Sequence, residues 1–134
     1  MQSIVNIDVD DLDKAIAFYT GALGLRLGRR LFDGSVAEML GAASPIHLLS
    51  KPSGSVAVPG AAPRRDYTRH WTPVHLDFVV DDVSSAVQRA VSAGAKREGE
   101  IESFAWGRLA VMSDPFGHGF CLVQFLGKGY DEVV

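Results

Sequence analysis

The stretch HLDFVVDDVSSAV, residues 75–87, decides the fold because it repeats IVNIDVDDLDKAI, residues 4–16. At an offset of 71 residues, the acidic pair Asp10 and Asp11 is matched by Asp81 and Asp82. Further matches follow in the same order at offsets of 73 and 74 residues: Gly34, Ala37 and Met39 with Gly107, Ala110 and Met112, and residues 46–48 with residues 120–122. Agreement at so many ordered positions indicates a duplicated structural unit.

Each copy of the repeat begins with a strand and a helix. Apolar and polar residues alternate in the first strand, over residues 4–9 and again over 75–80, which is typical of a strand with one buried face. Asp11 and Asp82 are predicted N-caps, because a carboxylate accepts the free N–H groups of the first helical turn. The pattern predicts helices over 12–20 and 83–93, closed by Gly21 and Gly94 in the left-handed conformation.

Three shorter apolar stretches follow each helix and predict three further strands. Their turns are predicted at Asp33-Gly34, at Trp106-Gly107 and at the DPFG sequence of residues 114–117. The predicted strands cover residues 25–32, 35–40 and 45–49 in the first copy, and 99–104, 108–113 and 119–125 in the second. The fold class is therefore α+β, with two strand–helix–three-strand (βαβββ) modules in tandem.

The domain organisation follows from the same pattern. Module one covers residues 1–50 and module two residues 74–126, with a tail at 127–134. Residues 51–73 between the modules are rich in proline, glycine and alanine and predict a long connection. We expect residues 1–134 to form a single domain, because neither copy alone closes a core.

Composition excludes several classes of function. With 13 basic and 16 acidic residues among 134, the net charge is −3, which does not favour a nucleic-acid surface. No apolar run approaches the roughly 20 residues needed to cross a membrane, and no secretion signal is visible at the start. The single cysteine cannot form an internal disulfide. We therefore expect a cytoplasmic protein.

Three stretches resemble the vicinal oxygen chelate superfamily, which includes glyoxalase I, bleomycin-resistance proteins and extradiol dioxygenases. They are DLDKAIAFYTGALGL at residues 11–25, the repeat at residues 75–87, and WGRLAVMSDPFGHGFCLVQF at residues 106–125. The resemblance implies two curved sheets around a cleft for a small-molecule ligand, and a homodimer. It does not imply one reaction, because a fold hosts many chemistries.

The resemblance also implies where a divalent metal would bind. Members of the superfamily that use a metal take one ligand from the first and one from the last strand of each unit, usually two histidines (or glutamine) and two glutamates. Those positions hold Ile4, His47, His75 and Cys121. Ile4 cannot ligate, so the usual four-ligand site is incomplete. His47, His75 and Cys121 would hold a metal with one open position, with zinc favoured by the thiolate. Alternatively, Cys121 is a small core residue and no metal binds.

Other candidate site residues lie on the strand faces that the resemblance directs into the cleft. His75 and Asp77 are candidate acid–base groups, since a carboxylate beside a histidine tunes proton transfer. The candidate ligand contacts are Asn6, Asp8, His47, His75, Trp106, Arg108 and Cys121. Trp106 would supply an aromatic wall, and Arg108 would pair with an anionic ligand.

Two hypotheses of function remain open at this point. The first is a protein that binds and sequesters a small hydrophobic or aromatic molecule without the usual four-ligand metal site. The second is a metal-dependent lyase, isomerase or dioxygenase with an atypical His/His/Cys site. The missing ligand at Ile4 favours the first hypothesis, and the polar cluster around His75 favours the second.

Overall fold

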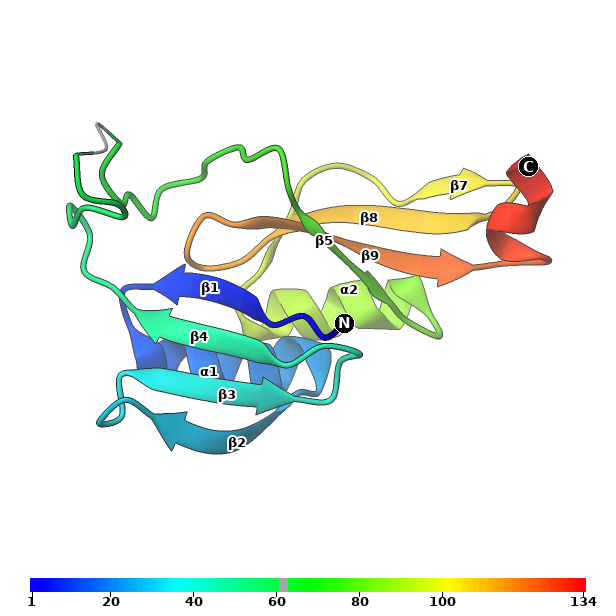
Figure 1. Cartoon of the computed structure of the whole chain (residues 1–134). Coiled ribbons are helices and arrows are strands. Elements are labelled where there is room, and N and C mark those ends of the chain that lie inside the picture. The colour runs from blue at the N-terminus through cyan, green and yellow to red at the C-terminus, as the bar shows by residue number, and fades with distance from the viewer. Residues whose placement is uncertain (61–62) are drawn as a thin grey trace. The chain divides into compact units, whose positions relative to one another are not determined.

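The computed structural model describes residues 1–60 and 63–134, which form two compact units, Met1–Thr68 and Arg69–Val134. Each unit contains one mixed sheet and one long helix (Figure 1). The predicted α+β class with two βαβββ modules is therefore confirmed. The assembly of the two units into one domain around a cleft stays a prediction.

The first unit carries the elements predicted for module one. They are β1 (Val5–Val9), α1 (Leu12–Leu23), β2 (Arg26–Leu31), β3 (Val36–Leu40) and β4 (Ile46–Ser50). The sheet order is β1-β4-β3-β2, with β1 parallel to β4 and the other pairs antiparallel. Alternation along the strands buries one face of the sheet against α1, with the side chains of Val9, Ala37, Met39, Ile46 and Leu48.

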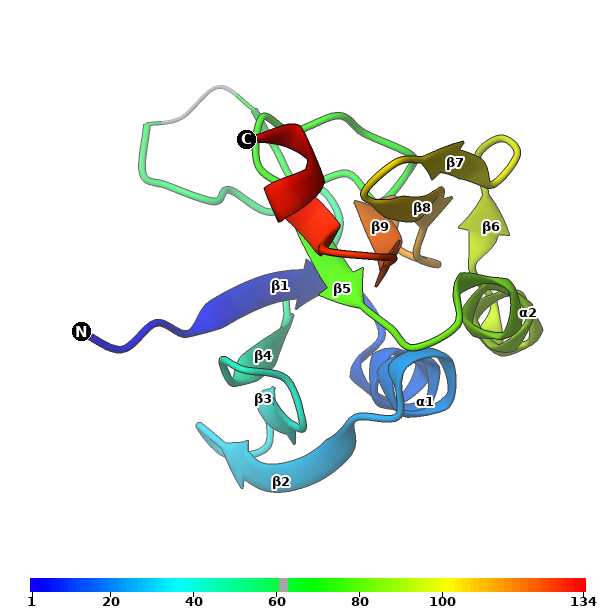
Figure 2. The ribbon, with the colours of Figure 1, turned by 90° about the vertical axis from the view of Figure 1, so that its right-hand side faces the viewer.

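The second unit repeats this order with one extra strand. Its elements are β5 (Leu76–Val79), α2 (Val83–Ala93), β6 (Lys96–Arg97), β7 (Glu102–Phe104), β8 (Gly107–Ser113), β9 (Gly119–Phe125) and a final 3-10 helix, η1 (Gly129–Val133). The sheet order is β5-β9-β8-β6, with β7 also paired to β8. Figure 2 shows α2 beside β6, and α2 buries Val83, Ala86, Val87 and Ala90.

The helix caps confirm most of the predicted boundaries. Asp11 accepts the backbone N–H of Lys14 at 3.0 Å, and Asp82 accepts that of Ser85 at 2.9 Å. Helix α2 covers the predicted residues and ends at Gly94, which has a φ of 118°. These caps satisfy backbone groups that a helix end leaves unpaired.

Helix α1 is longer than predicted, and the prediction of Gly21 as its C-cap is wrong. The helix passes through Gly21 and ends at Gly24, which has a φ of 67°; the N–H of Gly24 donates to the carbonyl of Thr20, and that of Leu25 to the carbonyl of Tyr19. A mid-helix glycine costs only about 1 kcal/mol. Burial of Ala22 beyond it offsets that cost, because its side chain continues the buried stripe of α1.

The strand predictions in the second unit also need two corrections. The stretch 99–104 contributes only β7 as a strand, because Gly99 has a φ of 119° that breaks the extended backbone. Strand β6, which covers only two residues, was not predicted. The turn before β8 is made by Ala105 and Trp106, one residue earlier than predicted. The DPFG turn is confirmed, with the N–H of Gly117 bonded to the carbonyl of Asp114 at 3.3 Å.

No helix within the described part of the chain is long and apolar enough to cross a membrane.

Candidate functional site

Equivalent rows of side chains cross the two sheets on the face opposite the helix. In the first unit the row runs through Asn6 on β1, His47 on β4 and Glu38 on β3, which are register partners. In the second unit the same row runs through Asp77 on β5, Cys121 on β9 and Val111 on β8. The sequence offsets of the repeat relate each residue of one row to its counterpart in the other.

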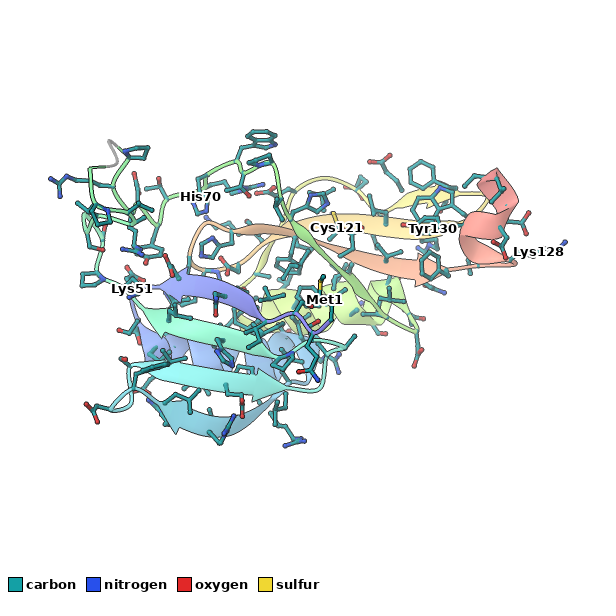
Figure 3. All side chains as sticks on the ribbon, viewed as in Figure 1. Met1, Lys51, His70, Cys121, Lys128 and Tyr130 are labelled. Carbon is teal, nitrogen blue, oxygen red and sulfur yellow. The ribbon has the colours of Figure 1, made fainter. Side chains whose placement is uncertain are left out.

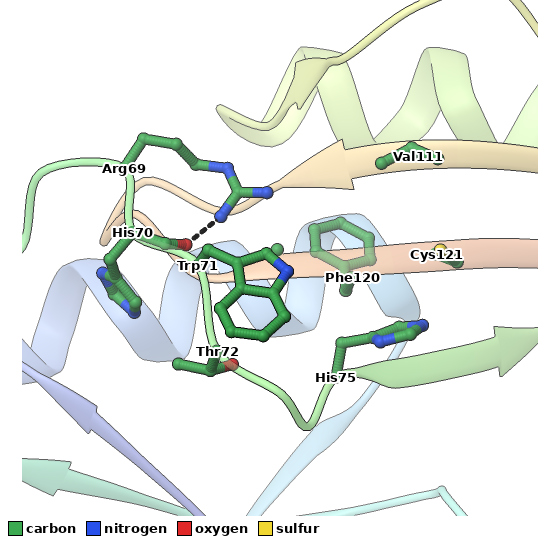
Figure 4. A pocket seen from close by; sticks show the side chains of 9 residues that line it. Arg69, His70, Trp71, Thr72, His75, Val111, Phe120 and Cys121 are labelled. Atoms are coloured by element: carbon green, nitrogen blue, oxygen red, sulfur yellow. Dashed lines mark hydrogen bonds between the residues drawn. The ribbon is translucent and has the colours of Figure 1, made fainter.

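The row of the second unit borders a pocket of about 240 Å³. The pocket lies where the chain segment before β5 passes the start of β9 (Figure 4). It is lined by Arg69, His70, Trp71, Thr72, His75, Val111, Gly119, Phe120 and Cys121. His75 and Cys121 were predicted as site residues, and the structure brings them together here.

His75, Asp77 and Cys121 form a compact group of potential metal ligands. His75 Nε2 lies 3.1 Å from Asp77 Oδ1, and the ligand atoms of all three residues lie within 4.8 Å of one another. Asp77 and Cys121 are register partners on β5 and β9, so the sheet itself sets their spacing. The structure thus brings His75 and Asp77 together, and their role as an acid–base pair stays a prediction.

The environment of Cys121 favours its neutral thiol. Burial raises the pKa of Cys121 to about 11, and the negative charge of Asp77 and a hydrogen bond to that carboxylate add to the effect. The free thiol is therefore protonated at neutral pH. A bound cation reverses this preference, because a coordinated thiol loses its proton.

The donor set fits a divalent metal. One imidazole, one carboxylate and one thiol supply three protein ligands, and three ligands plus an open position are typical of catalytic zinc sites. The soft sulfur favours zinc over metals that prefer oxygen ligands. The structure places Asp77 in this group, whereas His47 lies in the first unit. Ile4, which holds the remaining position of the family pattern, is 56% exposed and offers no donor atom.

The row of the first unit is occupied by an ion pair. Arg29 donates to both oxygens of Glu38, at 2.9 Å from Nε and 2.7 Å from Nη2. His47 Nε2 lies 3.8 Å from Glu38 Oε2. The hydrogen bonds from Arg29 hold the pKa of Glu38 below its usual range, although only 8% of this residue is exposed. His47 thus faces a carboxylate already bound by arginine.

Glu38 was missed by the sequence reasoning, although a signal existed. It interrupts VAEML, an otherwise apolar strand, and an acidic residue in such a strand requires a partner when it is buried. Its partner Arg29 lies on the neighbouring strand β2, and no local pattern in the sequence points to it.

Asp8 is held by the connection that follows β4. Arg65 Nε donates to Asp8 Oδ2 at 2.6 Å, and Arg65 also donates to Ser55 and to the carbonyl of Val56. Burial, with the charge of Asp8 as a second cause, raises the pKa of nearby Tyr67 to about 12. These contacts give Asp8 a structural role within the first unit, whereas Asn6 is exposed at the start of the polar row.

Trp106 and Arg108 do not line the pocket. Trp106 stacks on Phe104, with ring centroids 5.1 Å apart, and also contacts Phe125 and Tyr130. Figure 3 shows Tyr130 and His70 toward opposite ends of the β8–β9 hairpin. Arg108 is the register partner of Gln124, whose side chain accepts the N–H of Val83 at the start of α2. Arg108 therefore lies on the sheet face that carries the helix.

Four pocket residues come from the connection and were not predicted as site residues. Arg69, His70, Trp71 and Thr72 form one wall of the pocket. The segment is polar and aromatic, but it has no periodicity that would have placed it beside a strand. Only the tertiary fold brings it to the start of β9.

Solved structures with the same fold come from several bacteria. The fosfomycin resistance protein FosX from Listeria monocytogenes superposes with a TM-score of 0.72 at 20% identity, covering 99% of this chain and 95% of FosX. TioX from Micromonospora sp. ML1 superposes with a TM-score of 0.69 at 18% identity, covering 94% of this chain and 99% of TioX. A third structure is a glyoxalase/bleomycin resistance protein/dioxygenase family enzyme from Burkholderia phytofirmans PsJN. It superposes with a TM-score of 0.69 at 21% identity, covering 92% of this chain and 98% of that enzyme. At these identities the likeness establishes the fold.

The family assignment rests on the sequence itself. No curated protein matches the chain at a significant level. The family described as "Glyoxalase-like domain" matches residues 4–123, which includes both βαβββ modules. The chain therefore belongs to the glyoxalase-like domain family, within the glyoxalase/bleomycin resistance/dioxygenase (vicinal oxygen chelate) superfamily.

Proposed function

We propose that this protein binds a small hydrophobic or aromatic organic molecule in the pocket of its second unit. The observation that carries the proposal is the lining of this pocket, where Trp71, Val111 and Phe120 supply apolar surface beside His75 and Cys121. Apolar walls with a few polar groups are typical of small-molecule sites. A volume of about 240 Å³ lies below the usual range for drug-sized ligands, so the ligand is small.

His75 is the polar group that orients the ligand in this proposal. Its Nε2 lies 3.1 Å from Asp77 Oδ1, and this contact holds the imidazole in one orientation. His75 can therefore donate a hydrogen bond to an oxygen of the ligand, or move a proton to or from it.

A metal-dependent enzyme is the second candidate, and the His75–Asp77–Cys121 group favours it. These residues would hold the metal, with zinc favoured. A bound zinc ion would polarise a ligand oxygen or lower the pKa of a bound water. His75 and Cys121 both line the pocket, so a metal there would face the ligand. With zinc the reaction classes would be those of a lyase or an isomerase, and a dioxygenase would need a redox-active metal in the same group.

The first test is a ligand screen by thermal shift followed by calorimetry. Because one structural neighbour is a fosfomycin resistance protein and others are named for bleomycin resistance, both drugs belong in the screen with small aromatic alcohols. Binding that weakens about tenfold in His75→Ala, and is unchanged in His47→Ala, supports the proposed pocket. Binding that is insensitive to His75→Ala contradicts it.

The metal candidate is tested by elemental mass spectrometry of protein purified without chelators. One equivalent of zinc that is lost in Cys121→Ser and Asp77→Asn, but kept in His47→Ala, supports a site within the second unit. Loss in His47→Ala instead supports the His47, His75 and Cys121 set. If the purified protein contains no metal and takes up no added zinc, the metal-dependent candidate is contradicted and only the proposed ligand binding remains.

We also propose that the chain forms a homodimer and acts in the cytoplasm. The single cysteine and the structural likeness to this superfamily support these two proposals. Light scattering coupled to size exclusion measures the oligomeric state, and a monomer at micromolar concentration contradicts the dimer.

A further inference from the structure

We infer that Trp71 is the stacking platform of the pocket, and that the ligand is a flat aromatic ring with a hydrogen-bonding substituent. The inference rests on the pocket proposed above and narrows its ligand to one chemical class. It also assigns Arg69 as the residue that positions the platform.

The two tryptophans of the chain differ in how their rings are used. Trp106 is packed among Phe104, Phe125 and Tyr130. Trp71 is 81% exposed, and no aromatic ring of the described residues stacks on it. Tryptophan is usually well buried, so an exposed indole beside a pocket offers a free aromatic face.

Arg69 fastens the segment that carries Trp71. Its guanidinium binds Glu98 through two hydrogen bonds, 2.7 Å from Nε to Oε2 and 2.9 Å from Nη2 to Oε1. The guanidinium lies over Gly119, where an added Cβ would be 2.6 Å from Nη2. Gly119 therefore leaves room for the arginine at the start of β9.

His70 fastens the same segment from the other side. Its backbone N–H donates to the carbonyl of Gly117 at 3.1 Å, and its Nε2 lies 2.9 Å from His118 Nδ1. Arg69 also donates to the carbonyl of His70 (Figure 4). The residues before Trp71 are thus tied to Glu98, which follows β6, and to the DPFG turn and His118, which precede β9. A platform held in this way loses little conformational entropy when a ligand stacks on it.

The other residues that line the pocket explain why the ligand should carry a hydrogen-bonding substituent. Trp71 and His75 both line the pocket, and Figure 4 shows the indole and the imidazole beside the first half of β9. A flat ring on Trp71 would therefore bring its edge toward His75. Arg69 is neutralised by Glu98, and His75 is paired with Asp77, so the lining carries no free charge that would select an ionic ligand.

Two pairs of alcohols that differ only in aromaticity test the ligand class. They are 2-naphthol with decahydro-2-naphthol, and phenol with cyclohexanol, measured by calorimetry. We expect each aromatic compound to bind the wild type about tenfold more tightly than its saturated partner. Trp71→Leu should abolish that preference, and Trp106→Phe should keep it.

The outcomes separate this inference from the proposal on which it rests. If the aromatic and the saturated compound of each pair bind equally well, and both lose affinity in His75→Ala, the role of Trp71 is contradicted. The proposed ligand pocket is then still supported. Failure of all four compounds to bind overturns both. A preference that survives Trp71→Leu also overturns the inference.

The positioning role of Arg69 has its own readout. Gly119→Ala and Arg69→Gln should lower the ratio of aromatic to saturated affinity several fold, because the indole is no longer held. Arg69→Lys should not restore the ratio, since an ammonium cannot form the two-bond pair with Glu98. A loss of thermal stability with an unchanged ratio would show that Arg69 is structural only.

Discussion

The two sheets carry the same backbone row, but the side chains in these rows are used differently. In the first unit, Glu38 and His47 face each other, and Arg29 closes the row with an ion pair. In the second unit, Val111 replaces the carboxylate, and Cys121 borders a pocket. The first row therefore contains a carboxylate paired with arginine, whereas the second row contains a cysteine that lines a pocket.

This difference shows how one backbone pattern supports two roles. A buried carboxylate needs hydrogen-bonding or charged partners, and Arg29 supplies them for Glu38. Where the same position is valine, no partner is needed and the neighbouring groups remain accessible. Substitutions at equivalent positions of the two units are therefore the sharpest tests of the comparison.

The largest expected effect comes from the equivalent glycines Gly107 and Gly34. A Cβ on Gly107 would lie 2.2 Å from the backbone oxygen of Gln124, so Gly107→Ala must separate β8 from β9. We expect a loss of more than about 3 kcal/mol in the free energy of unfolding. Gly34 has a φ of 85° with no atom within 4 Å of an added Cβ, so Gly34→Ala should cost only about 1–2 kcal/mol. Urea unfolding measures both.

An equal loss in the two glycine variants would contradict this account, because it would mean that close strand contact is not what requires Gly107.

The next effect concerns the two histidines. His75→Ala should weaken binding of 2-naphthol about tenfold, the loss expected for one hydrogen bond. His47→Ala should leave this affinity unchanged, because His47 faces Glu38 in the first unit. Calorimetry of both variants provides the measurement. Equal weakening by the two substitutions would show that the ligand also contacts the first unit.

Glu38 should make the stability of the protein depend on pH. Its folded pKa is lowered from 4.5 by the hydrogen bonds from Arg29, so its contribution is present above the unfolded pKa and is lost as pH falls through the folded pKa. Glu38→Gln should lower the melting temperature by a few degrees at neutral pH. The difference in melting temperature between the wild type and Glu38→Gln should become smaller at acidic pH.

Thermal unfolding followed across the acid range checks the role of Glu38, with Asp13→Asn as a control at an exposed ion pair. A difference in melting temperature between wild type and Glu38→Gln that is the same at every pH would show that the ion pair with Arg29 does not stabilise the fold.

The smallest effect is on the reactivity of Cys121. Burial and Asp77 raise its pKa to about 11, so alkylation by iodoacetamide should be slow at neutral pH. Asp77→Asn removes the negative charge and lowers the thiol pKa, which should speed alkylation a few fold. Asp8→Asn, in the first unit, serves as the control. Since Cys121 is the only cysteine, intact-mass spectrometry of chelator-treated protein follows the reaction directly. An unchanged rate in Asp77→Asn would show that burial alone sets the reactivity.

Much of the fold could be predicted because its signals are local. The Asp11 and Asp82 caps, helix α2 and strand β9 follow from spacing and capping chemistry within a few residues. The extension of α1 beyond Gly21 could not be read in this way, because the burial of Ala22 depends on tertiary packing.

The candidate site was predictable only in part. Asp77 and Cys121 lie on strands whose alternation can be read, and the sheet register brings them together, with His75 directly before β5. Arg29 and Trp71 depend on contacts between segments that are not neighbours in a repeating pattern. The same holds for Trp106, whose aromatic neighbours include Tyr130 in the final 3-10 helix.

The sequence by itself determined the duplicated βαβββ plan, because repeated capping and alternation act over short distances. Only the tertiary structure decided how the buried carboxylate is paired and which residues of the connection line the pocket. These arrangements are the pairing of Arg29 with Glu38, and the attachment of the connection through Arg69 to Glu98 and through His70 to Gly117. Both depend on long side chains that reach across the fold, and their partners are set by three-dimensional packing rather than by spacing along the chain.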